Sequence, residues 1–98
     1  MGFWFKSNPT PPADVSRHEA AHARACRGEG IAYRWVNRKG EQVVEGEKGY
    51  GRGAAIALYA GAMAGGGDAN GDRKAALMLA KEAGISEDDL KRAARRYT

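Results

Sequence analysis

The stretch His18-Glu19-Ala20-Ala21-His22 contains both histidines of this 98-residue chain. Residues four apart on an α-helix share a face and lie about 6 Å apart along its axis, so the two imidazoles can bind one cation. Zinc suits such nitrogen ligands and is held by them at about 2.0 to 2.1 Å. Glu19 is rotated by about 100° from His18, which places its carboxylate beside the ion, where it can accept a proton from water. The pattern predicts a zinc site with a neighbouring general base.

A catalytic zinc site uses three protein ligands and keeps its fourth position for water. The chain has no third histidine, and its single cysteine, Cys26, rules out an internal disulfide. Cys26 lies two turns beyond the first histidine, and we expect it to be a small buried residue. The remaining carboxylates are Asp68 and Asp72 in a glycine-rich turn and Glu82 one helix further. The residues alone leave the third ligand open among these three.

The motif is expected to lie on a helix near the start of the chain. Thr10 can serve as its N-cap, with Pro11 at the first helical position, and the helix continues to Ala25. Gly28 and Gly30 then end it.

A β-hairpin is predicted after this helix. Residues 31–37 alternate, with Ile31, Tyr33 and Trp35 on one face, and a shorter strand follows over residues 42–45. A two-stranded hairpin is marginal alone, so its aromatic face must lie on a helix. We interpret the aromatic residues as core. The alternative is that Tyr33 or Trp35 forms a pocket wall where the hairpin edge takes up a peptide as an added strand.

The second half of the chain is predicted to hold three helices. Residues 54–64 are apolar or small throughout, which indicates a helix in the middle of the fold, after a glycine-spaced loop that contains Tyr50, a candidate second electrophile. A glycine-rich turn, 65–72, precedes a helix over 73–83 with Ala76, Leu79, Ala80 and Ala83 on one face, which Gly84 ends. A capping box, Ser86 with Asp89, starts a last helix whose apolar stripe is Leu90, Ala93, Ala94 and Tyr97.

These elements, taken in order, resemble the peptidase domain of FtsH-like ATP-dependent zinc proteases. The residues that carry the resemblance are His18-Glu19-Ala20-Ala21-His22-Ala23 and Gly71-Asp72 at the start of a further helix. In that family the first motif usually reads His-Glu-Ala-Gly-His-Ala, and an aspartate that opens a helix after a glycine-rich turn is the third zinc ligand. The resemblance covers residues 14–97 and implies His18, His22 and Asp72 as zinc ligands and Glu19 as catalytic base.

The sequence departs from this family at several points. Ala21 replaces the usual glycine, and Ala62-Met63-Ala64-Gly65 stands where acidic residues usually follow the central helix. The sequence shows neither an ATPase module nor a membrane anchor. The expected substrates are therefore short peptides, exposed termini or unfolded chains, unless a separate partner delivers folded proteins.

Composition gives the broad class. There are 16 Lys or Arg against 12 Asp or Glu, a net charge of +4, and 43% apolar residues, which is typical of one soluble domain. No run of residues is long and apolar enough to span a membrane, and the opening residues do not form a signal peptide, so we expect a cytoplasmic protein with no membrane partner. Because acids are mixed among the bases, the charge favours solubility over nucleic-acid binding.

Two other functions remain open. Residues 75–97 resemble a helix-turn-helix, which would bind DNA, but the second helix would present Glu87, Asp88 and Asp89 to the phosphates. Alternatively, zinc only stabilises a thin core, and Glu19 has no required role.

The sequence therefore predicts a small α+β, mainly helical, zincin-like protein with about four helices and a hairpin after the first. Residues 1–12 form an N-terminal lead, and residues 13–98 form one metallopeptidase domain. The expected activity is zinc-dependent peptide hydrolysis, and neither cleavage preference nor oligomeric state is readable from the sequence.

Overall fold

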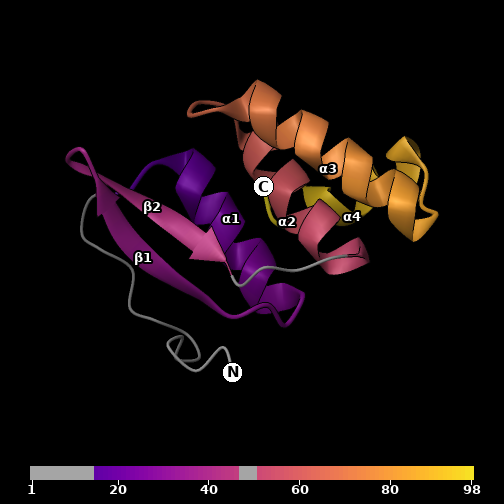
Figure 1. Ribbon diagram of the computed structural model, residues 1–98, viewed down its shortest axis with the longest axis horizontal. Coiled ribbons are helices and arrows are strands. Elements are labelled where there is room, and N and C mark those ends of the chain that lie inside the picture. Colours follow the sequence, from indigo (N-terminus) through magenta and orange to yellow (C-terminus); the bar gives the residue numbers. More distant parts are fainter. Residues whose placement is uncertain (1–14, 47–50) are drawn as a thin grey trace.

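A computed structural model describes residues 15–46 and 51–98. These residues form four helices and one antiparallel hairpin, so the predicted small, mainly helical α+β class is confirmed at this level (Figure 1). The hairpin lies along the first helix, and the second helix lies between the first and third. The elements are, in order, α1 (Arg17–Gly28), β1 (Tyr33–Arg38), β2 (Glu41–Gly46), α2 (Arg52–Ala64), α3 (Ala69–Ala83) and α4 (Glu87–Arg95).

Helix α1 begins later than the sequence predicted. Val15 is not helical, and Ser16 is the N-cap, since its side-chain oxygen accepts a hydrogen bond from the Glu19 N–H at 3.2 Å. This bond satisfies one of the free N–H groups of the first turn and fixes the helix start. The predicted cap, Thr10, lies outside the described residues. The predicted end is confirmed, because the helix stops at Gly28 and Gly30 has a positive φ of 72°.

The hairpin closes through the two-residue loop Lys39-Gly40, in which both φ angles are positive, at 53° and 88°. Such angles belong to a type I′ turn, whose twist matches that of the strands. The predicted face is confirmed: Tyr33 is buried in the core, with Trp35 packed against it, while Arg34 on the other face bonds to Glu45 on β2.

Helix α2 is the centre of the fold, as its apolar sequence predicted, because it packs against α1, α3 and α4. Small side chains such as Ala55, Ala57 and Ala60 are fully or almost fully buried and let these helices approach closely. No described helix is long and apolar enough to cross a membrane.

Helix α3 begins at Ala69, four residues before the predicted start at residue 73, because the Asp68 side chain caps it by accepting from the Gly71 N–H at 3.2 Å. Ala76 and Ala80 are buried as predicted, but Ala83 is exposed, so its assignment to the buried face was wrong. The neighbouring residues 81, 82 and 84 are exposed as well, so the whole last turn of α3 faces solvent. Gly84 ends α3 in a left-handed conformation, as expected.

Helix α4 has the predicted cap and stripe. The Ser86 hydroxyl accepts from the Asp89 N–H at 3.2 Å, and Leu90 is fully buried. Beyond the helix, Tyr97 contacts α1: its hydroxyl donates to Glu29 at 2.6 Å, and its carbonyl accepts from Arg24 at 2.9 Å. The end of the described chain is thus fixed to the first helix.

Candidate metal centre

Helix α1 presents two buried histidines to the interior. His18 is 3% exposed and His22 is 9% exposed, although polar side chains usually lie at the surface. Their rings are nearly perpendicular, with centroids 4.6 Å apart, and the two Nε2 atoms lie 3.1 Å apart. The i, i+4 spacing therefore brings both imidazoles to one point, as the motif predicted.

Helix α3 brings Asp72 to the same point. Its Oδ2 lies 2.8 Å from Nε2 of His18 and 2.8 Å from Nε2 of His22. Asp72 stands in the first turn of α3, where a carboxylate also interacts favourably with the helix dipole.

The other two candidate carboxylates do not join this group. Asp68 lines the same cavity but accepts the capping bond of α3, and Glu82 is exposed in the last turn of that helix. Ten residues of helix separate Glu82 from Asp72, which is about 15 Å along the axis.

The three atoms fit a zinc ion. Atoms 2.8 to 3.1 Å apart share a common point about 2.0 to 2.1 Å from each, which is the distance at which zinc binds nitrogen and carboxylate oxygen. The ligands of a tetrahedral zinc ion are about 3.3 Å apart, so only a small outward movement is needed.

Both ring nitrogens of His22 face oxygen atoms that accept hydrogen bonds. Its Nδ1 is 2.8 Å from the carbonyl oxygen of Ala57, which can only accept, so Nδ1 carries the proton. In the neutral ring, Nε2 then directs a bare lone pair at the Asp72 carboxylate. That contact is repulsive unless a proton or a metal ion lies between the two atoms.

The pKa values of this pair respond accordingly. Burial lowers the pKa of His22, but the hydrogen bonds to Asp72 and Ala57 and the charges of Asp72 and Glu19 outweigh it, so the pKa is raised. Burial raises the pKa of Asp72, but bonds to and charges on the two histidines outweigh it, so that pKa is lowered. Each of the two groups therefore favours the charged form of the other.

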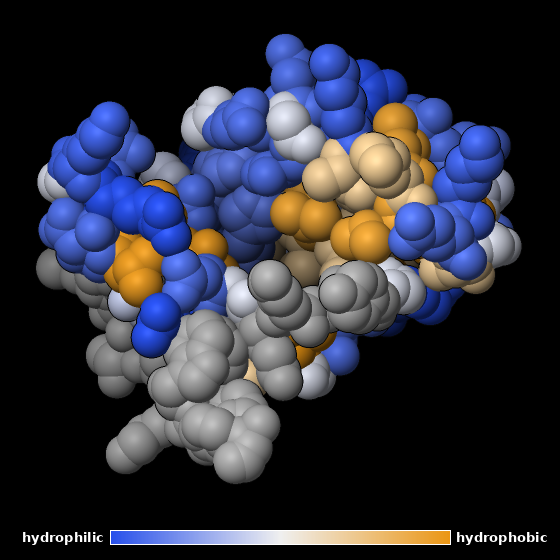
Figure 2. All heavy atoms as spheres, in the orientation of Figure 1, coloured by the Kyte–Doolittle hydropathy of each residue, from blue (hydrophilic) through white to orange (hydrophobic). Residues whose placement is uncertain are grey.

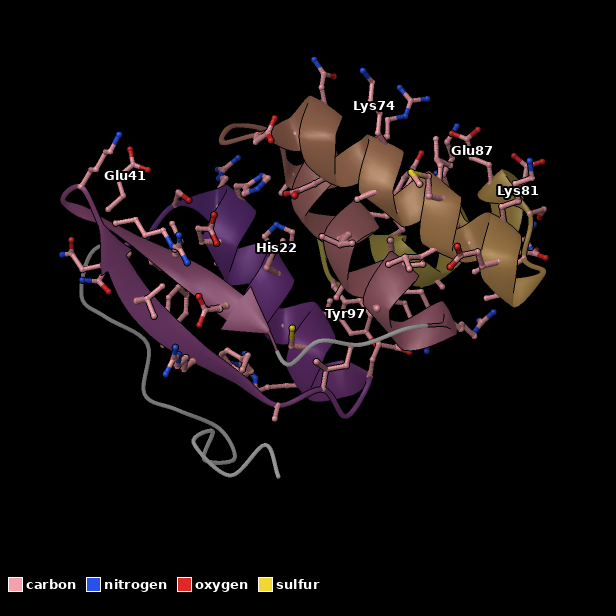
Figure 3. The ribbon with its side chains drawn as sticks, in the orientation of Figure 1. His22, Glu41, Lys74, Lys81, Glu87 and Tyr97 are labelled. Atoms are coloured by element: carbon pink, nitrogen blue, oxygen red, sulfur yellow. The ribbon has the colours of Figure 1, made fainter. Side chains whose placement is uncertain are left out.

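Backbone groups of α2 complete the support of His22, which lies between α1 and α2 (Figure 3). The Ala57 carbonyl accepts from Nδ1 and so fixes the orientation of the ring, as carbonyls behind metal-binding histidines do. A Cβ at Gly61 would overlap the His22 ring and would lie 2.7 Å from Nδ1. The sequence alone did not identify Ala57 or Gly61 as part of the site. Of the two, only Gly61 carries a signal, since a glycine within an alanine-rich helix indicates that another group approaches the backbone closely.

Glu19 lies beside the three atoms. Its Oε2 is 3.9 Å from Nε2 of His18, and its Oε1 accepts a hydrogen bond from the Val44 N–H of β2 at 2.8 Å. The carboxylate is mostly buried, with 16% of the side chain exposed. It is therefore next to the three converging atoms and is held there by the hairpin.

A cavity of 330 Å³ opens from the site along α1 and has a mainly apolar far end, which includes Cys26, Ile31 and Leu58. Figure 2 shows the surface hollowed between the hairpin and the α2–α3 side, where hydrophobic residues gather. Burial raises the pKa of Cys26 to about 11, a shift that the charge of Arg27 only partly opposes. This matches the expectation of a small buried residue.

The other predicted candidates lie elsewhere. Tyr33 is buried, its hydroxyl accepts from Arg27 at 2.7 Å, and it does not line the cavity, so it does not form a pocket wall. Tyr50 lies outside the described residues. In α4, Glu87 accepts hydrogen bonds from Tyr59 and Arg73, so this acid of the helix-turn-helix alternative is used within the fold.

Comparison of the chain with models of known protein families, with curated proteins and with solved structures finds no match.

Proposed function

We propose that the protein is a zinc-dependent peptide hydrolase, in which His18, His22 and Asp72 bind zinc and Glu19 is the general base. The observation that carries the proposal is the convergence of Nε2 of His18, Nε2 of His22 and Oδ2 of Asp72, which lie 2.8 to 3.1 Å from one another. Two nitrogens and one carboxylate oxygen are a common ligand set of catalytic zinc.

Zinc, when bound, supplies Lewis acidity, because it lowers the pKa of water to about 7 and polarises a carbonyl. The chain supplies the proton transfers. Glu19 accepts a proton from the water that attacks the carbonyl carbon and returns it to the leaving nitrogen as the carbon–nitrogen bond breaks. Its position 3.9 Å from His18 Nε2 suits a group that works beside the ion.

The cavity indicates the size of the substrate. A volume of 330 Å³ is at the lower end for ligand pockets and accommodates one or two side chains. We propose short peptides or unfolded chains as substrates, with a separate delivery partner needed for folded proteins. The proposed activity and a zincin-like fold are also what the resemblance to FtsH-like peptidases implies. That resemblance rests on the motif over residues 18–23 and on Asp72.

A structural zinc site is the second candidate, and one observation favours it: His18 and His22 are buried, and their contacts with Asp72 would let a bound ion link α1 to α3 inside the fold. A Glu19→Gln variant separates the two functions, because the Gln amide oxygen can still accept from the Val44 N–H. We expect one zinc per chain and an unchanged melting temperature, with hydrolysis of a mixed peptide library reduced at least a hundredfold. Wild-type protein that binds zinc but cleaves no peptide would identify the site as structural.

Metal analysis must use protein without a histidine tag. His18→Ala and His22→Ala should each lose the zinc, and unchanged metal content in both would remove the proposed site. Binding of duplex DNA that weakens with salt would instead support the helix-turn-helix alternative.

A further inference from the structure

The Glu19 side chain has an unusual partner for its place in the helix. Ser16 and Glu19 have the spacing of a capping box, in which the glutamate returns to the N–H of its own N-cap residue. Instead, Oε1 of Glu19 accepts from the N–H of Val44, 25 residues along the chain. The position of the carboxylate is therefore set by the hairpin.

The hairpin register explains why this N–H is available. In a two-residue hairpin the pair beside the loop, here Arg38 with Glu41, is hydrogen-bonded, and the following pairs alternate. Val44 pairs with Trp35, three steps from the loop pair, so it belongs to a pair without ladder bonds. Its N–H points away from β1, and bonding to Glu19 costs the sheet nothing.

The second oxygen of Glu19 is close enough to matter for the metal. Ligand-capable atoms of His18, Glu19 and His22 all lie within 4.8 Å of one another, and Oε2 is 3.9 Å from His18 Nε2. If Glu19 were to join His18, His22 and Asp72, four protein ligands would close the zinc site. A general base must instead stay beside the ion, so the two roles exclude each other.

We infer that the Val44 N–H holds Glu19 back from the metal and so keeps the fourth coordination position open for water. Val44 is then a positioning residue, and the outer edge of β2 decides whether the site is hydrolytic or structural. This inference rests on the proposed function, and it adds to it a requirement for an intact hairpin.

The main test removes this single donor. Val44→Pro deletes the N–H at an edge position that tolerates proline, and Gln42→Pro is the matched control, because its N–H also points outward but does not meet Glu19. In the cobalt-loaded protein, the visible spectrum of Val44→Pro should change to that of a site with an additional carboxylate ligand. Zinc binding should tighten about tenfold and peptide hydrolysis fall about ten- to a hundredfold, with Gln42→Pro unchanged in all three.

Two measurements leave the hairpin sequence intact, in case Val44→Pro does not fold. Cobalt-loaded wild type and Glu19→Gln should have the same spectrum, since Glu19 is not a ligand. In the metal-free protein, the Val44 amide should exchange slowly in wild type and Glu19→Gln and faster in Glu19→Ala.

The outcomes separate the two claims. Three results would overturn the inference while leaving the zinc site in place. They are different cobalt spectra of wild type and Glu19→Gln, the same zinc affinity and hydrolysis rate in the two proline variants, and fast exchange of the Val44 amide in wild type. Protein that binds neither zinc nor cobalt would overturn the proposed function, and the inference with it, even where Val44 exchanges slowly.

Discussion

Gly61 gives a sharp test of the metal centre, because this position on α2 determines where the His22 ring can lie. A Cβ added at Gly61 would lie 2.7 Å from Nδ1 of His22 and closer still to the far edge of the ring. Since ordinary van der Waals contacts begin near 3.4 Å, Gly61→Ala should push the ring by about 1 Å. Zinc sites tolerate about 0.2 Å in their ligand distances, so we expect zinc affinity to fall at least tenfold.

The stability of the metal-free Gly61→Ala variant follows from three contributions. Overpacking a core costs about 1 to 3 kcal/mol, and loss of the His22 bond to Ala57 costs about 1 kcal/mol. Alanine returns about 0.8 to 1.0 kcal/mol in helix propensity. The net loss of about 1 to 3 kcal/mol corresponds to a melting temperature lower by roughly 5 to 20 °C in a domain of this size.

Gly53→Ala is the matched control in the same helix. Its Cβ would meet Glu29 and Ile31 at 3.4 and 3.5 Å, which are ordinary contacts. We expect it to keep zinc affinity and to gain stability of up to about 1 kcal/mol. The assays are zinc competition against a fluorescent chelator and thermal unfolding with and without zinc. If Gly61→Ala bound zinc as tightly as Gly53→Ala does, His22 would not be a ligand.

Three further predictions concern single groups. Asp72→Ala should lose zinc while Asp68→Ala keeps it with a weakened helix start, as measured by metal analysis and thermal unfolding; the reverse pattern would make Asp68 the ligand. With a chelator present, the free energy of unfolding should be greatest between about pH 4 and 6.5. The pKa of His22 is raised on folding, so its stabilisation is complete below the ordinary value of 6.5 and is lost as the pH rises through the folded value. The pKa of Asp72 is lowered on folding, so its stabilisation is present above 3.8 and is lost as the pH falls through the folded value. Thermal unfolding across pH tests this, and His22→Gln should remove the alkaline slope. The Cys26 thiol, whose pKa burial raises to about 11, should react slowly with iodoacetamide at pH 7.5 and rapidly in denaturant; fast labelling of the folded protein would contradict its burial.

Periodicity and turn chemistry gave the helix and strand types correctly from the sequence, because their signals are local. The start of α3 was placed late because Asn70 and Gly71 are poor helix formers, although Asp68 after three glycines is itself a capping signal. The sequence predicts the start of α1 at Thr10, whereas the observed cap is Ser16, whose side chain accepts from the Glu19 N–H. Serine and threonine both favour N-caps, so residue type alone does not rank the two positions.

In the candidate site, too, the features set by local sequence could be predicted and those set by tertiary packing could not. The spacing of His18 and His22 is a local signal, so their convergence could be predicted. Asp72 could be named only as one of several carboxylates, because its contact with the histidines depends on how α2 places α3 against α1. The Ala57 carbonyl and the Val44 N–H carry no sequence signal, because every residue has a carbonyl and every residue except proline has an N–H.

The contact of Tyr97 with α1 has a kinetic consequence. Helical domains usually fold in microseconds to milliseconds because most of their contacts are between near neighbours in sequence. Here the Arg24 and Glu29 contacts with Tyr97 span 73 and 68 residues, and the His22 contact with Asp72 spans 50. The conformational search must bring together both ends of the described chain, so folding should be slower than in a three-helix bundle of equal length.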